Sequence, residues 1–149
     1  MKTMTFSLLY PAQGKSMRHG SRAAMGSKRE RWASADELLC FSGVAPVIER
    51  SGKSSWTRWR YFCPKFTRQA FVEYAGESIR HSKWAGAFYL SQKAKGKSHQ
   101  AAVRALAYKW IRIIWKCWRT REKYDEARYV ECLREKGSKL VGDLPSAPA

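Results

Sequence analysis

The sequence lacks any long apolar run. No stretch approaches the ~18–20 consecutive apolar residues that cross a bilayer. The apolar stretch near the start, residues 6–10, ends at Pro11 and is too short for the hydrophobic region of a signal peptide. These absences predict a cytoplasmic protein with no membrane partner.

The spacings that bind metals or nucleotides are absent as well. The cysteines form no CxxC pair, which excludes a zinc ribbon and predicts reduced thiols rather than a disulfide framework; they are Cys40, Cys63, Cys117 and Cys132. The three histidines are far apart, and the carboxylates form no cluster suited to two metal ions. Two Gly-Lys-Ser triplets, at 14–16 and 52–54, have Leu9 and Val47 where a phosphate-binding loop needs its earlier glycine. The chain is therefore predicted to hold no cofactor of its own.

Acidic residues are scarce. The 149 residues include 29 Lys and Arg but only 12 Asp and Glu, a net charge of +17. Residues 50–70 and 78–121 contain basic residues and no acidic ones, whereas an ordinary soluble surface mixes both signs. Such a charge favours a polyanionic partner, with nucleic acid first and an anionic membrane surface second. An aromatic content of 13% excludes a mostly disordered chain.

The patterns that are present predict a mainly α fold: a small helical domain of about five helices, with a basic connecting loop and disordered termini. Helices are expected at residues 35–42, 64–81, 83–95, 99–120 and 125–135, from apolar periodicity and from capping residues such as Ser34, Ser82 and Ser98. Residues 44–60 are expected to be a polar, basic connection in which Val47 and Ile48 could form a short strand. Residues 1–22 are expected to be an atypical arm, residues 23–138 the domain, and residues 139–149 a disordered tail.

The segment 99–120 is the strongest predicted helix. Its apolar stripe, Val103, Leu106, Trp110 and Ile114, is best explained as core. A second stripe is basic and is the candidate phosphate-binding side; it includes Arg104, Arg112 and Lys116.

Ser51 is the one candidate nucleophile. It lies between Arg50 and Gly52 and is followed by Lys53. A serine hydroxyl attacks a phosphate only where cations surround both groups, and Gly52 would let a backbone approach closely. Composition alone favours the alternative, an ordinary polar turn.

Longer runs of sequence favour the first interpretation. The chain resembles the C-terminal domain of DEDD-type insertion-sequence transposases of the IS-one-ten class over about residues 23–138. The runs that carry the resemblance are RERWASADEL (29–38), FSGVAPV (41–47), RSGKS (50–54), RYFCPKF (60–66), AVRALA (102–107), KWIRI (109–113) and YDEARY (124–129).

The resemblance implies a two-part enzyme. In the family, an N-terminal RuvC-like domain supplies four acidic metal ligands, and the helical domain supplies a serine that attacks DNA and forms a phosphoserine link. A structured noncoding RNA pairs with donor and target DNA, and the recombinase acts as an oligomer. The family's serine corresponds to Ser51. The candidate nucleic-acid contacts, inferred from charge, are Arg50, Lys53, Arg58, Arg60, Lys65, Arg68, Arg104, Arg112 and Lys116.

Two departures from the family shape the expected function. The acidic domain is absent, so magnesium is expected only with that missing domain, and this truncated transposase is predicted to be inactive alone. The family's Pro-Gly-x-Gly turn is replaced by residues 11–21, which suggests a disordered or frame-shifted arm. The expected partners are DNA, structured RNA, and a full-length transposase or further copies of the chain, on the bacterial nucleoid. The alternatives are a stand-alone DNA- or RNA-binding regulator of a full-length transposase and, last, a membrane-surface protein that uses the amphipathic segment 99–120.

Overall fold

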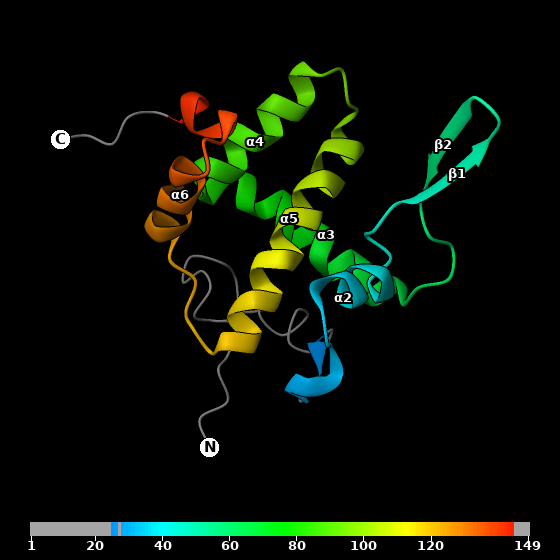
Figure 1. Ribbon diagram of the computed structural model, residues 1–149, viewed down its shortest axis with the longest axis horizontal. Helices are drawn as coiled ribbons and strands as arrows, with labels where there is room; N and C mark the ends of the chain where they lie inside the picture. The colour runs from blue at the N-terminus through cyan, green and yellow to red at the C-terminus, as the bar shows by residue number, and fades with distance from the viewer. Residues whose placement is uncertain (1–24, 27, 145–149) are drawn as a thin grey trace.

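The computed structural model describes residues 25, 26 and 28–144, and the fold is mainly helical, as predicted. Five α-helices and one two-stranded sheet lie wholly within these residues (Figure 1). The elements in chain order are η2 (Arg29–Arg31, a 3-10 helix), α2 (Ala35–Phe41), β1 (Val47–Ser51), β2 (Ser54–Arg58), α3 (Lys65–His81), α4 (Lys83–Ala94), α5 (His99–Thr120), α6 (Glu126–Glu135) and η3 (Lys139–Asp143, a 3-10 helix).

The predicted helix boundaries are confirmed to within one residue, and side-chain caps fix four of the five helix starts. Ser34, Ser82, Ser98 and Asp125 each accept a hydrogen bond from a backbone N–H in the first turn that follows. Glycines with positive φ follow three of the helices, at Gly43 (72°), Gly96 (79°) and Gly137 (62°). None of the described helices is both long and apolar enough to cross a membrane.

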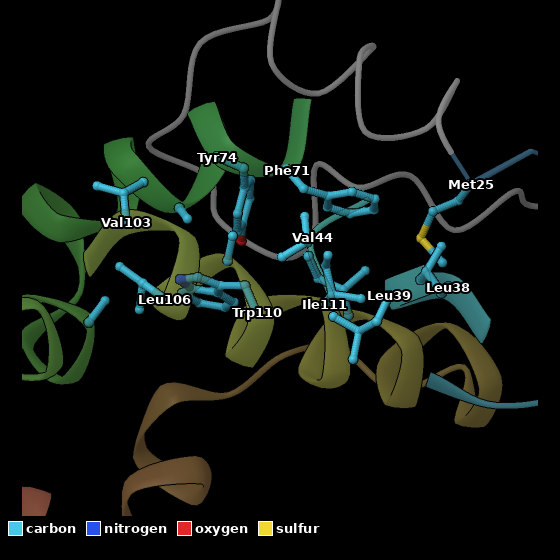
Figure 2. Close-up of a cluster of buried hydrophobic side chains, with 14 of the residues drawn as sticks. Met25, Leu38, Leu39, Val44, Phe71, Tyr74, Val103, Leu106, Trp110 and Ile111 are labelled. Carbon is cyan, nitrogen blue, oxygen red and sulfur yellow. The ribbon is translucent and has the colours of Figure 1, made fainter. Parts of the chain in front are cut away.

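Helix α5 is the centre of the core and packs against α2, α3 and α4. The predicted apolar stripe is confirmed, since Val103, Leu106, Trp110 and Ile114 are all buried. Figure 2 shows the first three of these side chains in the core. Trp110 meets Tyr74 of α3 edge-on, with ring centroids 5.2 Å apart, and its Nε1 donates a hydrogen bond of 2.7 Å to Ser78 Oγ. One tryptophan thereby joins the two longest described helices through both apolar and polar contacts.

The prediction of a basic loop over residues 44–60 is corrected by the structure. Most of this connection is an antiparallel β-hairpin. Strands β1 and β2 pair from Val47 with Arg58 to Ser51 with Ser54. Every hairpin residue except the half-buried Val47 is exposed, so the inside–outside alternation that marks most strands in a sequence is missing. The hairpin projects from the helices at the right of Figure 1.

The start of the predicted disordered tail, residues 139–149, is also corrected by the structure. Lys139–Asp143 forms η3, which packs against α4 and α6 and buries Leu140. Residues 145–149 and the predicted arm, residues 1–22, lie outside the described residues.

Candidate nucleic-acid interface

Ser51 lies at the tip of the hairpin, as the last residue of β1. It faces Ser54 across a two-residue turn made of Gly52 and Lys53, and its side chain is exposed. Gly52 has φ +58° and Lys53 does not share this positive φ, which is the pattern of a type II′ hairpin turn. A Cβ on Gly52 would meet no described atom within 4 Å. The glycine therefore serves the turn rather than a close backbone approach within the described chain.

The strand register divides the hairpin side chains between two faces. Successive residues of a strand point to opposite faces, so Ser51 shares its face with Glu49 and with their cross-strand partners Ser54 and Trp56. Arg50 belongs to the other face. The two cations that adjoin Ser51 in sequence are thus separated, with Arg50 behind the serine's face and Lys53 in the turn.

Arg58 is charge-paired within the hairpin. Its Nη2 forms an ion pair with Glu49 Oε2 on the face that carries Ser51, and both side chains are about half exposed. Exposed pairs of this kind stabilise a fold by only ~0–1 kcal/mol. The pair instead reduces the free positive charge on the face that carries Ser51, and it engages the carboxylate closest to Ser51 along the strand.

A second group of predicted residues meets at the base of the hairpin around Trp59. The Arg68 and Arg104 guanidinium carbons lie 5.2 and 4.3 Å from the centre of the Trp59 ring. Arg68 Nη1 also donates a 3.1 Å hydrogen bond to the carbonyl oxygen of Arg60. Partial burial lowers the pKa of Arg104, and arginine still keeps its charge at neutral pH.

Trp59 is the member of this group that sequence reasoning did not assign to the site. The signal was the alternation of aromatic and basic residues over 56–60, WTRWR. Cation–π contacts on Trp59 join α3 to α5 and hold two guanidinium groups beside the hairpin.

The structure therefore distributes the predicted site over separate regions. Ser51 is about 13 Å along the strand from Val47, at ~3.3 Å for each residue, so the tip and the base are distinct contact points. Arg112 lies about 12 Å along α5 from Arg104, and Lys116 lies one turn further on; both are exposed. Lys65, also exposed, is the first residue of α3.

The tip is chemically incomplete among the described residues. No three of their His, Cys, Asp and Glu side chains are grouped so that they could hold a metal ion. All four cysteines are free thiols, in keeping with the sequence prediction. What the hairpin tip offers is an exposed hydroxyl with Lys53 in the adjoining turn and Arg50 on the opposite face.

Comparison with known proteins gives these features a context. Residues 11–90, which include the whole hairpin, match the sequence profile of the transposase IS116/IS110/IS902 family. The chain is 27% identical, over 121 residues and 81% of its length, to the candidate mini-circle transposase for IS117 of Streptomyces coelicolor. It is 33% identical, over 107 residues and 70% of its length, to an uncharacterized 42 kDa protein of insertion element IS900 from Mycobacterium paratuberculosis. The matched parts are 29% and 27% of those relatives, so the chain spans less than a third of their length.

Proposed function

The chain belongs to the IS116/IS110/IS902 transposase family, and on that premise we propose that it is the DNA-binding domain that supplies the nucleophilic serine, Ser51, for transposition. The observation that carries the proposal is the position of Ser51. Its hydroxyl is exposed at the end of a projecting hairpin, with Arg50 and Lys53 beside it in sequence. A two-stranded ribbon fits the major groove of DNA, and cations beside the nucleophile stabilise the charge that develops on an attacked phosphate.

The proposed step is a transesterification at phosphorus. The Ser51 oxygen forms a new bond to the phosphorus of a DNA phosphodiester, and the bond from that phosphorus to one deoxyribose oxygen breaks. The serine hydroxyl loses its proton, and the released sugar oxygen gains one. The product is a phosphoserine diester that retains the energy of the broken linkage for rejoining, so no external energy source is needed.

This chemistry requires groups beyond those that the described residues supply. Glu49 is paired with Arg58, and the described residues hold no metal-ligand cluster. We therefore expect the acidic, magnesium-binding groups to come from outside the described residues. The base of the hairpin and the exposed cations of α5 are available for DNA or structured RNA.

The incomplete tip also favours a second candidate function. In this candidate, the chain binds nucleic acid without catalysing transposition and competes with a full-length transposase as a regulator. This candidate shares the predicted DNA binding but forms no covalent adduct.

A trans-complementation assay tests the proposal. The chain is mixed with a purified acidic domain and labelled donor DNA, and covalent protein–DNA adducts are resolved on a denaturing gel. Ser51→Ala should remove the adduct by ~100-fold or more, because no other group replaces the nucleophile. Ser54→Ala is the matched control, since Ser54 faces Ser51 across the turn, and it should retain the adduct.

Binding is measured separately by fluorescence anisotropy on duplex DNA over a salt series. Ser51→Ala should bind like the wild type, whereas Arg50→Gln with Lys53→Gln should reduce the salt slope by roughly two, one for each lost phosphate contact. An adduct that persists in Ser51→Ala would refute the serine assignment. Salt-dependent binding without any adduct would favour the regulator.

A further inference from the structure

A groove at the base of the hairpin has an apolar lining that the proposed serine chemistry does not use. It lies between α2, α4 and α5 and encloses about 800 Å³, within the roughly 300–1,000 Å³ of small-molecule sites. Ala101 and Ala105 line it from α5, one turn apart, and their small side chains leave the space open. Phe88 of α4, Tyr108 of α5 and Val44 add further apolar and aromatic surface.

The same groove also carries four positive charges. Arg60, Lys97, Arg104 and Lys109 line it, and Asp36 is the one acidic residue among the residues that form it. Lys109 Nζ lies 4.7 Å from the centre of the Phe88 ring, and Lys97 Nζ donates a 2.6 Å hydrogen bond to Gln92 Oε1. Four cations against one carboxylate favour an anionic ligand.

Two of these cations are partly withdrawn from water. Burial lowers the pKa of both Lys109 and Arg104. The buried Nε of Arg60 has no hydrogen-bond acceptor among the described residues. A ligand that brought an anionic oxygen into the groove would return to these groups the electrostatic stabilisation that burial removes.

A ligand for this groove thus needs a flat apolar part and an anionic part. We infer that the groove binds one unstacked nucleotide of a single-stranded nucleic acid, with the base against Ala101, Ala105 and the aromatic side chains and the phosphate on the cations. A base within a duplex has both faces stacked and cannot enter in this way, whereas a flipped or single-stranded base can. The inference rests on the proposed function for the class of ligand and adds to it a site distinct from the Ser51 tip.

Filling the groove tests the inference with the full chain. Ala105→Leu adds bulk to the α5 side of the groove without changing its charge, and Ala94→Leu adds the same side chain at an exposed position of α4 outside the groove. Anisotropy is measured on a 20-nucleotide single-stranded DNA, on the same strand made wholly of abasic sites, on an RNA of the same sequence and on the duplex. Ala105→Leu should weaken binding of the base-containing single strands by about ten-fold or more. Its binding of the abasic strand and the duplex should stay within about two-fold of wild type, as should all binding by Ala94→Leu.

A charge variant keeps the test valid if Ala105→Leu fails to fold, which circular dichroism reports. Lys109→Gln, with the exposed Lys93→Gln as its control, should weaken single-strand binding more than its control does. Weaker binding of both single-stranded DNA and RNA by the groove variants supports a site that accepts a nucleotide from either nucleic acid. Weaker binding of RNA alone assigns the nucleotide to RNA.

Unchanged single-strand binding in both groove variants would overturn the inference, as would equal losses on single strands and duplex. Either result leaves the proposed function intact if the wild type still binds duplex DNA. A wild-type chain that binds no nucleic acid overturns both, whereas groove-dependent binding of single strands without any duplex binding overturns only the proposed function.

Discussion

The hairpin and helix α5 differ in how far their side chains are exposed to solvent. Along α5, one side is buried against three other helices, and Trp110 is surrounded by aromatic rings. In the hairpin almost every side chain is exposed, including Trp56 at 51%. The difference indicates that stability lies in the helices and that the hairpin is free to contact a partner. Substitutions in the two regions should therefore have separable effects on folding and on binding.

Truncating one tryptophan in each region should give the largest contrast. Trp110→Ala removes a fully buried side chain and the donor to Ser78, and should lower the free energy of unfolding by about 3–5 kcal/mol. Trp56→Ala should lower it by about 0.5 kcal/mol, since exposed positions contribute little. Urea denaturation followed by circular dichroism measures both.

Among folded molecules, Trp56→Ala should reduce the affinity for DNA more than Trp110→Ala does. Trp56→Ala keeps the fold and loses an exposed aromatic on the face of Ser51, so any change it causes is in affinity for DNA. Equal losses of stability in the two variants would contradict the division between a stabilising core and a contacting hairpin.

Two glycines with positive φ, one at the end of α2 and one in the hairpin turn, allow the helices and the hairpin to be compared at the backbone. Gly43 (φ +72°) ends α2, and a Cβ there would lie 2.4 Å from the Sγ of Cys63, a residue that follows the hairpin. Gly43→Ala combines left-handed strain with this clash and should cost about 2–4 kcal/mol. Gly52→Ala has the strain without the clash and should cost about 1 kcal/mol. Thermal or urea unfolding distinguishes the two.

Cys63→Gly tests whether the clash with the Cys63 side chain causes the larger penalty of Gly43→Ala. It removes the side-chain atoms that the new methyl group would meet, so in its background Gly43→Ala should cost no more than Gly52→Ala does in the wild type. A full penalty that persists without the Cys63 side chain would mean that backbone strain alone explains the effect.

The sequence predicted the helices well because their signals are local. Capping residues such as Ser98 and the apolar stripe around Trp110 fix both the start and the buried side of a helix. The hairpin was missed for a physical reason, since a strand with no buried face has no alternation to detect. The burial of Leu140 was missed because η3 packs against α4, a helix that is distant in sequence.

The candidate site was only partly predictable. Basic residues close in sequence were treated as one group, yet the register places Arg50 and Ser51 on opposite faces and pairs Arg58 with Glu49. The contact of Arg68 and Arg104 with Trp59 joins residues 36 positions apart, which the sequence of one chain does not reveal. The role of Ser51 as a nucleophile remains a prediction that rests on the family and on its exposed position.

The smallest predicted effect concerns a partly buried tyrosine, Tyr124, and the pH. Tyr124 OH accepts a 2.6 Å hydrogen bond from Trp84 Nε1, and burial raises the pKa of Tyr124 well above its usual value near 10. Tyr124→Phe leaves the buried Trp84 N–H without its acceptor, and should cost about 1–2 kcal/mol at neutral pH. Tyr61→Phe, at an exposed position beyond the hairpin, should change the stability by less than about 0.5 kcal/mol.

The sign of the pH effect follows from linkage. Below about pH 10 both folded and unfolded chains keep the Tyr124 proton, so its contribution is constant. At higher pH the unfolded chain loses that proton while the folded chain retains it, and stability falls by up to about 1.4 kcal/mol for each pH unit. Partly buried Tyr129, whose pKa is also raised, and Lys109, whose pKa is lowered, titrate in both proteins, so the informative quantity is the stability of the wild type minus that of Tyr124→Phe. That difference should shrink as the pH rises from 9 to about 11, and a constant difference would mean that Tyr124 ionises as readily in the fold as in the unfolded chain.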